Sequence, residues 1–118
     1  MTTDCLFCKI VAGEIPSEQV YSDEHVVVFK DINPKAAVHL LIVPREHIIS
    51  LNDLEERHDG LMAYMMRLLP KLAKEQGLDK GFRTVINTGP GGGQLVFHLH
   101  IHLLGGEGLS GVGFSRAV

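Results

Sequence analysis

The sequence has few of the features that mark membrane, secreted or nucleic-acid-binding proteins. Its longest apolar runs, VVVF and LLIV, are far shorter than the roughly 18 residues that a helix needs to cross a bilayer. The 11 basic residues are scattered and outnumbered by 14 acidic ones, so no basic surface for DNA or RNA is expected. The N-terminal MTTDCLFCKI lacks the basic and then apolar composition of a secretory signal. We therefore expect a cytoplasmic protein that binds neither membranes nor nucleic acids.

The chain is also short of cysteine, with two in 118 residues, at Cys5 and Cys8. In a reducing location a C-x-x-C pair is expected as thiols or metal ligands rather than as a structural disulfide. Apolar residues make up 45% of the chain and charged residues 21%, which is ordinary for a globular protein. We predict a single domain over residues 1–118, small enough to gain stability from oligomerisation, with a glycine-rich and mobile C-terminal segment over residues 105–118.

The apolar pattern predicts several short strands and one long helix. Residues 5–13 have the spacing of a short helix, which would place both cysteines on one face. The run QVYSDEHVVVFKD has β-branched and aromatic residues on both sides of an acidic turn, which is typical of a hairpin. VHLLIVP, RTVINT and LVFHLHIHLL read as three further strands. Because short links favour antiparallel pairing, the predicted fold class is α+β with about five strands.

The long helix is predicted to begin at Asp53, where apolar residues start to recur every three or four positions. Asn52 and Glu55 have the spacing of a capping box, and Gly77 is expected to end the helix. Pro70 lies inside this segment and removes one backbone donor, so a kink or a locally opened turn is expected there.

Three histidines stand at alternate positions in VFHLHIHLL. On a strand this spacing places His98, His100 and His102 on one face, and Phe97, Leu99, Ile101 and Leu103 on the face that packs. Three neutral imidazoles can bind a catalytic metal ion. Alternatively, one imidazole attacks an electrophile while a neighbour supplies a proton to the leaving group. A solvated polar strand face explains three such residues poorly, and the pattern alone does not choose between the two functional uses.

The segment INTGPGGGQ lies directly upstream of the histidines. Asn87 and the backbone N–H groups of a glycine turn can approach an anion closely, although a plain hairpin loop also fits this composition. The segment is not a Walker A motif, because it lacks the Gly-Lys-Ser/Thr ending.

These motifs together resemble the histidine triad (HIT) superfamily. HLHIHLL matches its H-φ-H-φ-H-φ-φ signature, where φ is apolar, and DINPKAAVHLLIVPREHI resembles its upstream signature. VINTGPGGGQLVFHLHIHLLGG is similar to the Hint branch, the histidine triad nucleotide-binding proteins. The resemblance implies a five-stranded antiparallel sheet with one long helix and a short N-terminal helix, paired into a ten-stranded homodimer. It also implies hydrolysis of purine nucleoside phosphoramidates or adenylates through a covalent nucleotidyl-histidine, without a catalytic cofactor.

The same resemblance implies a role for individual residues. His100 matches the nucleophile, His102 the residue that contacts the phosphate and the leaving group, and His39 a supporting histidine. Leu95 stands where many Hint proteins have a polar residue near the phosphate. Together with His100 and His102, the positions that match nucleotide contacts are Phe7, Phe29, Asp31, Ile32, Asn87, Gly93 and Gln94.

Zinc-containing relatives in the superfamily bind the ion through positions that match Cys5, Cys8, His47 and His98, so the resemblance implies a structural zinc site. Buried thiols and a redox dithiol are the alternatives for the two cysteines. His25 and His58 fit neither the triad nor the zinc pattern and are predicted to lie on the surface. Two other functions stay open from the sequence: a metalloenzyme that uses the three triad histidines as ligands, and a non-catalytic module that binds nucleotides and regulates a partner.

Overall fold

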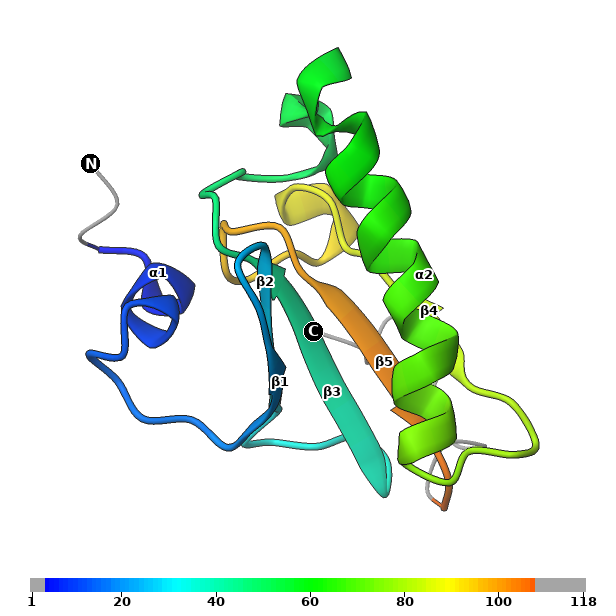
Figure 1. The fold of residues 1–118 in the computed structure, drawn as a ribbon. Helices are drawn as coiled ribbons and strands as arrows, with labels where there is room; N and C mark the ends of the chain where they lie inside the picture. Colours follow the sequence, from blue (N-terminus) through cyan, green and yellow to red (C-terminus); the bar gives the residue numbers. More distant parts are fainter. Residues whose placement is uncertain (1–3, 108–118) are drawn as a thin grey trace.

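The computed structural model describes residues 4–107 of the chain (Figure 1). The helices are α1 (Leu6–Val11) and α2 (Asp59–Glu75), and single 3-10 turns occur at Leu51–Asp53, Glu56–His58 and Pro90–Gly92. The strands are β1 (Gln19–Ser22), β2 (Val26–Lys30), β3 (Val38–Pro44), β4 (Arg83–Val85) and β5 (Ile101–Gly105).

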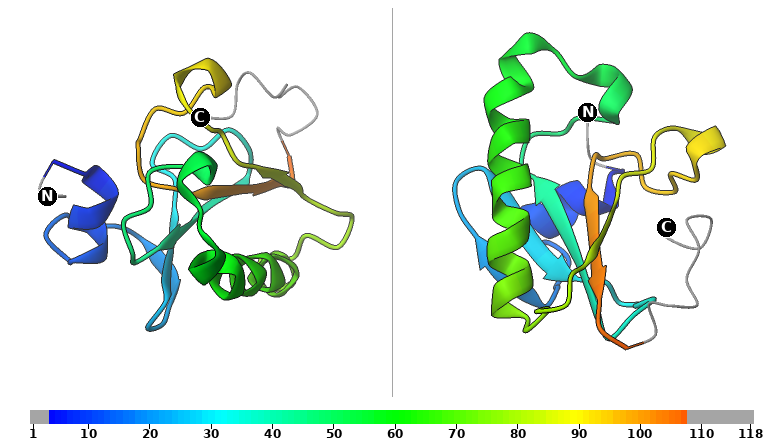
Figure 2. Two further views of the ribbon diagram at one scale, coloured as in Figure 1. Left: turned by 90° about the horizontal axis from the view of Figure 1, so that it is seen from above. Right: turned by 90° about the vertical axis from the view of Figure 1, so that its right-hand side faces the viewer.

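The five strands form one sheet in the order β1-β2-β3-β5-β4, and every neighbouring pair is antiparallel. The two helices lie on opposite sides of this sheet, with the long α2 along one face and the short α1 against the other (Figures 1 and 2). The predicted fold class and number of strands are therefore confirmed.

Alternation along the central strands divides the core into two layers. In β2, Val26 and Val28 pack with α2, whereas Val27 and Phe29 pack with α1. Successive side chains of a strand point to opposite faces, so a strand covered on both sides consists of apolar residues throughout. The same rule explains the apolar run Leu40–Val43 in β3, and it places His102 of β5 on the α1 side of the sheet, opposite Leu41.

The long helix begins later than predicted. Leu54 has extended backbone angles (φ −70°, ψ 142°), and the two 3-10 turns precede the first α-helical residue, Asp59. The predicted pairing of Asn52 with Glu55 is wrong, because the capping box is formed by Glu55 and His58 instead. Short-range apolar spacing does not separate consecutive 3-10 turns from a regular helix, which is why the boundary was misplaced.

Helix α2 continues through Pro70 to Glu75. Pro70 is exposed, so the carbonyl group that lacks its usual N–H partner is on the side of the helix that faces water. The predicted end of the helix is close to the observed one, since Gly77 follows it with a positive φ of 75°.

The last strand is shorter than predicted. β5 starts at Ile101, so His98 and His100 lie in the irregular segment before it, and Phe97 is 46% exposed rather than packed. β4 likewise ends at Val85 rather than continuing to residue 88. The inward position of Leu99, Ile101 and Leu103 is confirmed, since all three are buried.

The C-terminal segment was predicted to be mobile from residue 105. Gly105 is instead a buried residue of β5 that pairs with Val38, and the N–H of Ala37 donates to the carbonyl of Glu107. Residues 108–118 of that predicted segment lie outside the described residues.

Substituting Gly105 is expected to destabilise the fold. A Cβ atom at Gly105 would lie 2.6 Å from Cδ1 of Leu78, closer than van der Waals contact allows. We expect Gly105→Ala to lower the free energy of unfolding by about 1–3 kcal/mol, as measured by urea denaturation. Gly60→Ala is the matched control, because nothing lies within 4 Å of its added Cβ. Equal stability of the two variants would contradict this packing argument.

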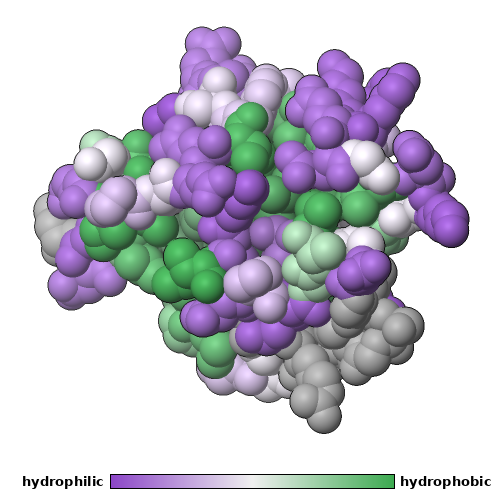
Figure 3. Space-filling model, turned by 90° about the horizontal axis from the view of Figure 1, so that it is seen from below, coloured by the Kyte–Doolittle hydropathy of each residue, from purple (hydrophilic) through white to green (hydrophobic). Residues whose placement is uncertain are grey.

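Within residues 4–107 we find no helix of the length and apolar character that a bilayer crossing requires. Seen from below, hydrophilic residues cover much of the surface, with apolar residues in separate patches between them (Figure 3).

Candidate functional site

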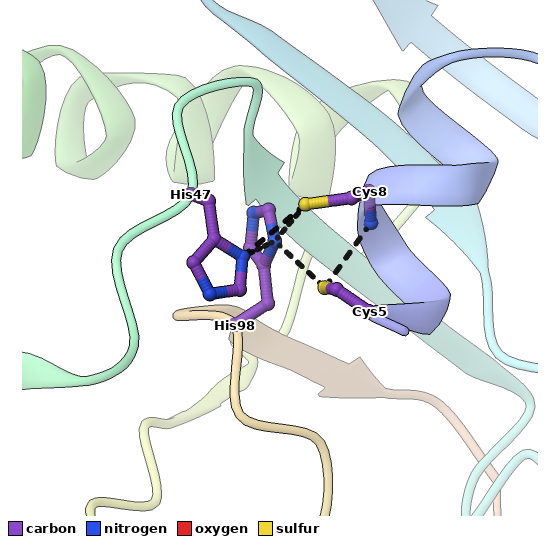
Figure 4. Close-up of side chains that lie close together, drawn as sticks. All are labelled: Cys5, Cys8, His47 and His98. Carbon is purple, nitrogen blue, oxygen red and sulfur yellow. Dashed lines mark hydrogen bonds between the residues drawn. The ribbon is translucent and has the colours of Figure 1, made fainter. Parts of the chain in front are cut away.

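Four side chains from distant parts of the chain form a compact Cys/His cluster (Figure 4). Cys5 and Cys8 come from the start of α1, His47 from the loop after β3, and His98 from the segment before β5. Their ligand atoms all lie within 4.8 Å of one another. The structure thus brings together all four residues that were predicted as metal ligands.

The spacing of these atoms fits a tetrahedral ion. His47 Nδ1 lies 3.2 Å from His98 Nδ1 and 3.2 Å from Cys8 Sγ, and His98 Nδ1 lies 3.3 Å from Cys5 Sγ. Zinc bonds of about 2.0–2.1 Å to nitrogen and about 2.3 Å to sulfur place tetrahedral ligands about 3.3–3.8 Å apart. His98 Nε2 donates to the carbonyl of Pro44 at 2.8 Å, so Nδ1 carries the lone pair that a metal needs.

His100 is buried and held in a single orientation. Its Nδ1–H donates to the carbonyl of His98 at 2.7 Å, and its ring packs edge-on against Phe7 with centroids 4.9 Å apart. Because Nδ1 carries the proton in the neutral ring, Nε2 keeps its lone pair. Burial lowers the pKa of His100, which favours this neutral form. A buried imidazole with an oriented lone pair is suited to nucleophilic attack.

His39 and His102 form a second oriented pair beside His100. The backbone N–H of Lys35 donates to His39 Nδ1 at 3.1 Å, so the proton of neutral His39 is on Nε2. That Nε2–H donates to His102 Nδ1 at 2.9 Å, which leaves the His102 proton on Nε2. His102 Nε2 is buried and has no hydrogen-bond partner among the described residues. The centroids of the His102 and His100 rings are 4.9 Å apart. The unpaired N–H of His102 is therefore a candidate proton donor to a substrate bound at His100.

Burial keeps this pair uncharged near neutral pH. The pKa of His102 is lowered from 6.5 to about 3, mainly by desolvation and in addition by the neighbouring His100 and His39. Burial also lowers the pKa of His39, although the carboxylate of Asp31, 3.5 Å from Nε2, acts in the opposite direction. A bound anion would favour the charged form, so the protonation state of the pair depends on what the site contains.

The triad histidines do not share a metal site among the described residues. The only other group with ligand spacing there consists of Asp31, His39 and His102. In that group the Lys35 N–H occupies Nδ1 of His39, so Nε2 holds the proton of the neutral ring rather than a lone pair. The geometry therefore disfavours the metalloenzyme hypothesis and favours a hydrogen-bonded pair.

The residues predicted to hold a nucleoside are only partly assembled. Phe7 and Phe29 are buried, with ring centroids 5.5 Å apart, and Phe7 also touches His100. Asp31 accepts from the N–H of Asn33 and lies near His39. Ile32, in contrast, is 89% exposed and has most of its surface available for contact.

The predicted phosphate side is the glycine loop before β5. Gly93 has a positive φ of 87°, and a Cβ added there would be 4.0 Å from Asn87 Cγ, so these two residues lie side by side. Gln94 is buried, accepts from the N–H of Gly89 and donates to the carbonyls of Ile49 and Val96. The side chain of Gln94 therefore fixes the shape of this loop.

Of the two histidines that were predicted to lie on the surface, one is exposed and the other is buried. His25 is exposed, as predicted. His58 is buried, since its Nδ1 accepts from the N–H of Glu55 and its Nε2 lies 3.0 Å from Glu46. The prediction for His58 is wrong because this side chain satisfies a helix N-terminus, which the misplaced helix start concealed.

The profile of the family described as "Scavenger mRNA decapping enzyme C-term binding" matches residues 4–113, and known HIT proteins match over most of their length. The chain belongs to the HIT family. It is 54% identical over 102 residues to protein HitA of Neisseria gonorrhoeae, covering 86% of this chain and 95% of HitA.

Two further HIT relatives and one HIT structure add detail. The purine nucleoside phosphoramidase of Escherichia coli is 41% identical over 110 residues, covering 92% of each chain. A 14 kDa zinc-binding protein of Zea mays is 47% identical over 104 residues, covering 86% of this chain and 81% of the relative. The solved HIT family hydrolase of Clostridium thermocellum is 43% identical with a TM-score of 0.88, and the match covers 92% of this chain and 96% of the hydrolase. The chain is thus similar to HIT hydrolases over nearly all of its length.

Two groups in this HIT site were missed by the sequence analysis. The backbone N–H of Lys35 sets the tautomer of His39, and the carbonyl of Pro44 sets that of His98. Both are main-chain groups, so residue identity carries no signal for them. Only the three-dimensional position of the loop after β2 and of the end of β3 identifies their roles.

Proposed function

We propose that this HIT hydrolase cleaves purine nucleoside phosphoramidates, and related adenylates, through a covalent nucleotidyl-histidine at His100. The observation that carries the proposal is the direction of the hydrogen bonds: His100 presents a lone pair on Nε2, and His102 presents an N–H. The E. coli relative named purine nucleoside phosphoramidase supports the substrate class.

In the first step, His100 Nε2 attacks the phosphorus atom and the P–N bond breaks. The carbonyl of His98, which accepts from Nδ1–H, stabilises the positive charge that develops on the ring. The leaving amine needs a proton, which the Nε2–H of His102 is oriented to supply. In the second step, water attacks the same phosphorus atom, its proton passes to Nε2 of His102, the bond to His100 Nε2 breaks and the monophosphate is released.

The proton for the amine enters with the substrate. In the free protein His102 and His39 are both neutral. An anionic phosphate beside them stabilises the protonated form and so raises the pKa of the pair. Binding therefore draws one proton from solvent onto His39 Nδ1, where it replaces the hydrogen bond from the Lys35 N–H, and the Asp31 carboxylate near His39 favours this charge. Transfer of a proton from His102 Nε2 to the amine, with the His39 Nε2 proton passing to His102 Nδ1, returns the pair to its neutral form. The water proton of the second step charges the pair again and returns to solvent when the product leaves.

The nucleoside is assigned to the side of the site formed by α1 and the loop after β2. Phe7 and Phe29 form the apolar wall, the exposed Ile32 is positioned to cover the base, and Asp31 is assigned to the ribose hydroxyls. Asn87, Gly93 and Gln94 supply or shape the backbone donors for the phosphate, as the glycine loop beside them suggests.

The Cys/His cluster is assigned to a structural zinc ion bound by Cys5, Cys8, His47 and His98. The ligand spacing and the tautomer of His98 fit zinc, and the Zea mays relative is named a zinc-binding protein. A cytoplasmic, reducing location would keep both sulfurs available as ligands.

The protein is also proposed to form a homodimer with a continuous ten-stranded sheet. β4 is an edge strand of three residues, and the apolar side chains of Phe82 next to it and Met66 on α2 are 37% and 40% exposed. A second copy would cover an edge and apolar surface that are costly to leave in water. Sedimentation equilibrium at micromolar concentration tests this, and a monomer would contradict it.

Release of adenosine monophosphate from adenosine 5′-phosphoramidate tests the function. Continuous turnover, with ammonia and the monophosphate formed in equal amounts, is the expected result. Tight binding of the monophosphate without turnover of either the adenosine or the guanosine compound would contradict it and favour the nucleotide-binding module.

Binding of adenosine monophosphate at pH 7 is expected to take up a proton. The lowered pKa values of His39 and His102 keep the free pair neutral, and the phosphate anion raises them, so the sign is uptake. Titration calorimetry in buffers of different ionisation enthalpy measures the number of protons. His102→Gln is expected to abolish the uptake, and an unchanged value in that variant would contradict the assignment.

A further inference from the structure

We infer that Cys5 and Cys8 form a peroxide-sensitive pair whose oxidation to a disulfide ejects the metal ion and displaces His100. The inference goes beyond the proposed function, although its consequence for turnover rests on that function. It depends on three features of the cluster: access to a sulfur atom, the closeness of the two sulfurs, and a hydrogen-bonded path from the cluster to His100.

The cluster is accessible from the surface. Both cysteines are half-buried, and Cys5 and His47 line a surface cavity of about 360 Å³. The other lining residues are Asp4, Leu6, Leu95, Val96 and Phe97, so the wall is mainly apolar and Asp4 is its one charged residue. A small neutral oxidant such as hydrogen peroxide can therefore reach the sulfur of Cys5, whereas His98 behind it is fully buried.

The two sulfurs are placed for an intramolecular disulfide. Cys5 caps the N-terminus of α1, and its Sγ accepts from the N–H of Cys8 at 3.3 Å, which holds that sulfur beside the first turn of the helix. The sulfurs lie within 4.8 Å of each other, and residues three apart at a helix start have the Cα separation that a disulfide needs. No disulfide joins them in the structure.

The reaction balances without any further reagent. The Cys5 sulfur attacks one oxygen of hydrogen peroxide, the O–O bond breaks, and a sulfenic acid and hydroxide form. The Cys8 sulfur then attacks the sulfenic sulfur, the S–S bond forms and a second hydroxide leaves. Two metal-bound thiolates are oxidised to one disulfide, one peroxide is reduced to two hydroxide ions that take up two protons from solvent, and the metal loses two of its four ligands.

His98 connects the cluster to the nucleophile. Its Nδ1 lies 3.3 and 3.4 Å from Cys5 and Cys8 Sγ, and its own carbonyl accepts the Nδ1–H that orients His100. Phe7, between the two cysteines in sequence, packs against both His98 and His100. A disulfide must move the first turn of α1 and release the His98 ring, so two of the contacts that hold His100 change together.

The experiment treats the zinc-loaded full chain with hydrogen peroxide. We expect intact mass to fall by two hydrogens, one zinc ion per chain to appear in a chromogenic chelator, and phosphoramidate turnover to fall about ten- to hundred-fold. Dithiothreitol with added zinc is expected to restore all three. Nitrogen NMR gives an independent readout, because His100 is the ring expected to carry its proton on Nδ1, and that pattern should change on oxidation.

Cys8→Ser is the matched variant for the disulfide: peroxide should not remove two hydrogens from it, whereas the loss of a metal ligand lowers its zinc content and its turnover before any oxidation. If it does not fold, the mass, metal and NMR measurements on the wild-type chain decide alone. The inference is overturned by a chain that binds no zinc, by a disulfide that leaves zinc bound, by sulfonic acid in place of a disulfide, or by a disulfide that leaves the His100 signal unchanged. A chain that never hydrolyses the phosphoramidate refutes the proposed function, while these three readouts still test the inference.

Discussion

His100→Ala is expected to lower the rate of phosphoramidate hydrolysis on the order of 10,000-fold, because the reaction loses its nucleophile rather than a supporting group. Binding of adenosine monophosphate should stay within about ten-fold of wild type, since His102 and the glycine loop remain. Steady-state release of the monophosphate, with calorimetric binding of the product, measures both quantities.

His25→Ala is the control for this prediction. His25 is exposed and lies outside the site, so its removal should leave turnover unchanged. His100→Ala also removes a buried ring that packs against Phe7, so the unfolding temperature of each variant must be measured beside its rate. A folded His100→Ala protein that keeps more than a tenth of wild-type turnover would exclude His100 as the nucleophile.

Removing the two cysteine ligands is expected to lower stability strongly. The double variant Cys5→Ser/Cys8→Ser should bind less than a tenth of the zinc of wild type and lose at least about 3 kcal/mol, or roughly 10 °C in unfolding temperature. The reason is that the cluster joins α1, the loop after β3 and the segment before β5, which are distant in sequence. Metal analysis and thermal denaturation check the result.

Chelated wild-type protein is the control for the metal. If zinc is the source of the stability, wild type without zinc should unfold near the temperature of the double variant, and adding zinc should restore only the wild type. A double variant that binds one zinc per chain, or one as stable as zinc-loaded wild type, would contradict the assignment.

The sheet could be predicted from the sequence because its strands are short and their alternation is strong. The runs Val26–Phe29 and Leu40–Val43 are apolar throughout, as expected for strands that are covered on both faces. The start of α2 could not be predicted, because Leu54 breaks the helix through backbone angles that its side chain does not signal. His58 was misplaced for the same reason.

The sequence predicted which residues form the candidate site more completely than it predicted how they are arranged. The triad spacing identified His98, His100 and His102, and the family resemblance implied different roles for them. The structure adds the contacts that fit this division, with His98 in the Cys/His cluster and His102 hydrogen-bonded to His39. That division depends on contacts between residues up to 93 positions apart and on backbone groups such as the Lys35 N–H. Neither kind of contact is visible in local sequence.

The covalent intermediate on His100 is the central claim, and trapping it is the most direct test. Wild-type protein mixed with adenosine 5′-phosphoramidate is quenched in base within milliseconds, digested and examined by mass spectrometry. We predict an adenylyl group on the peptide of His100, stable in base, lost in acid and absent from His100→Ala. Active protein that never carries the group under these conditions, or that carries it on His102 instead, would contradict the mechanism.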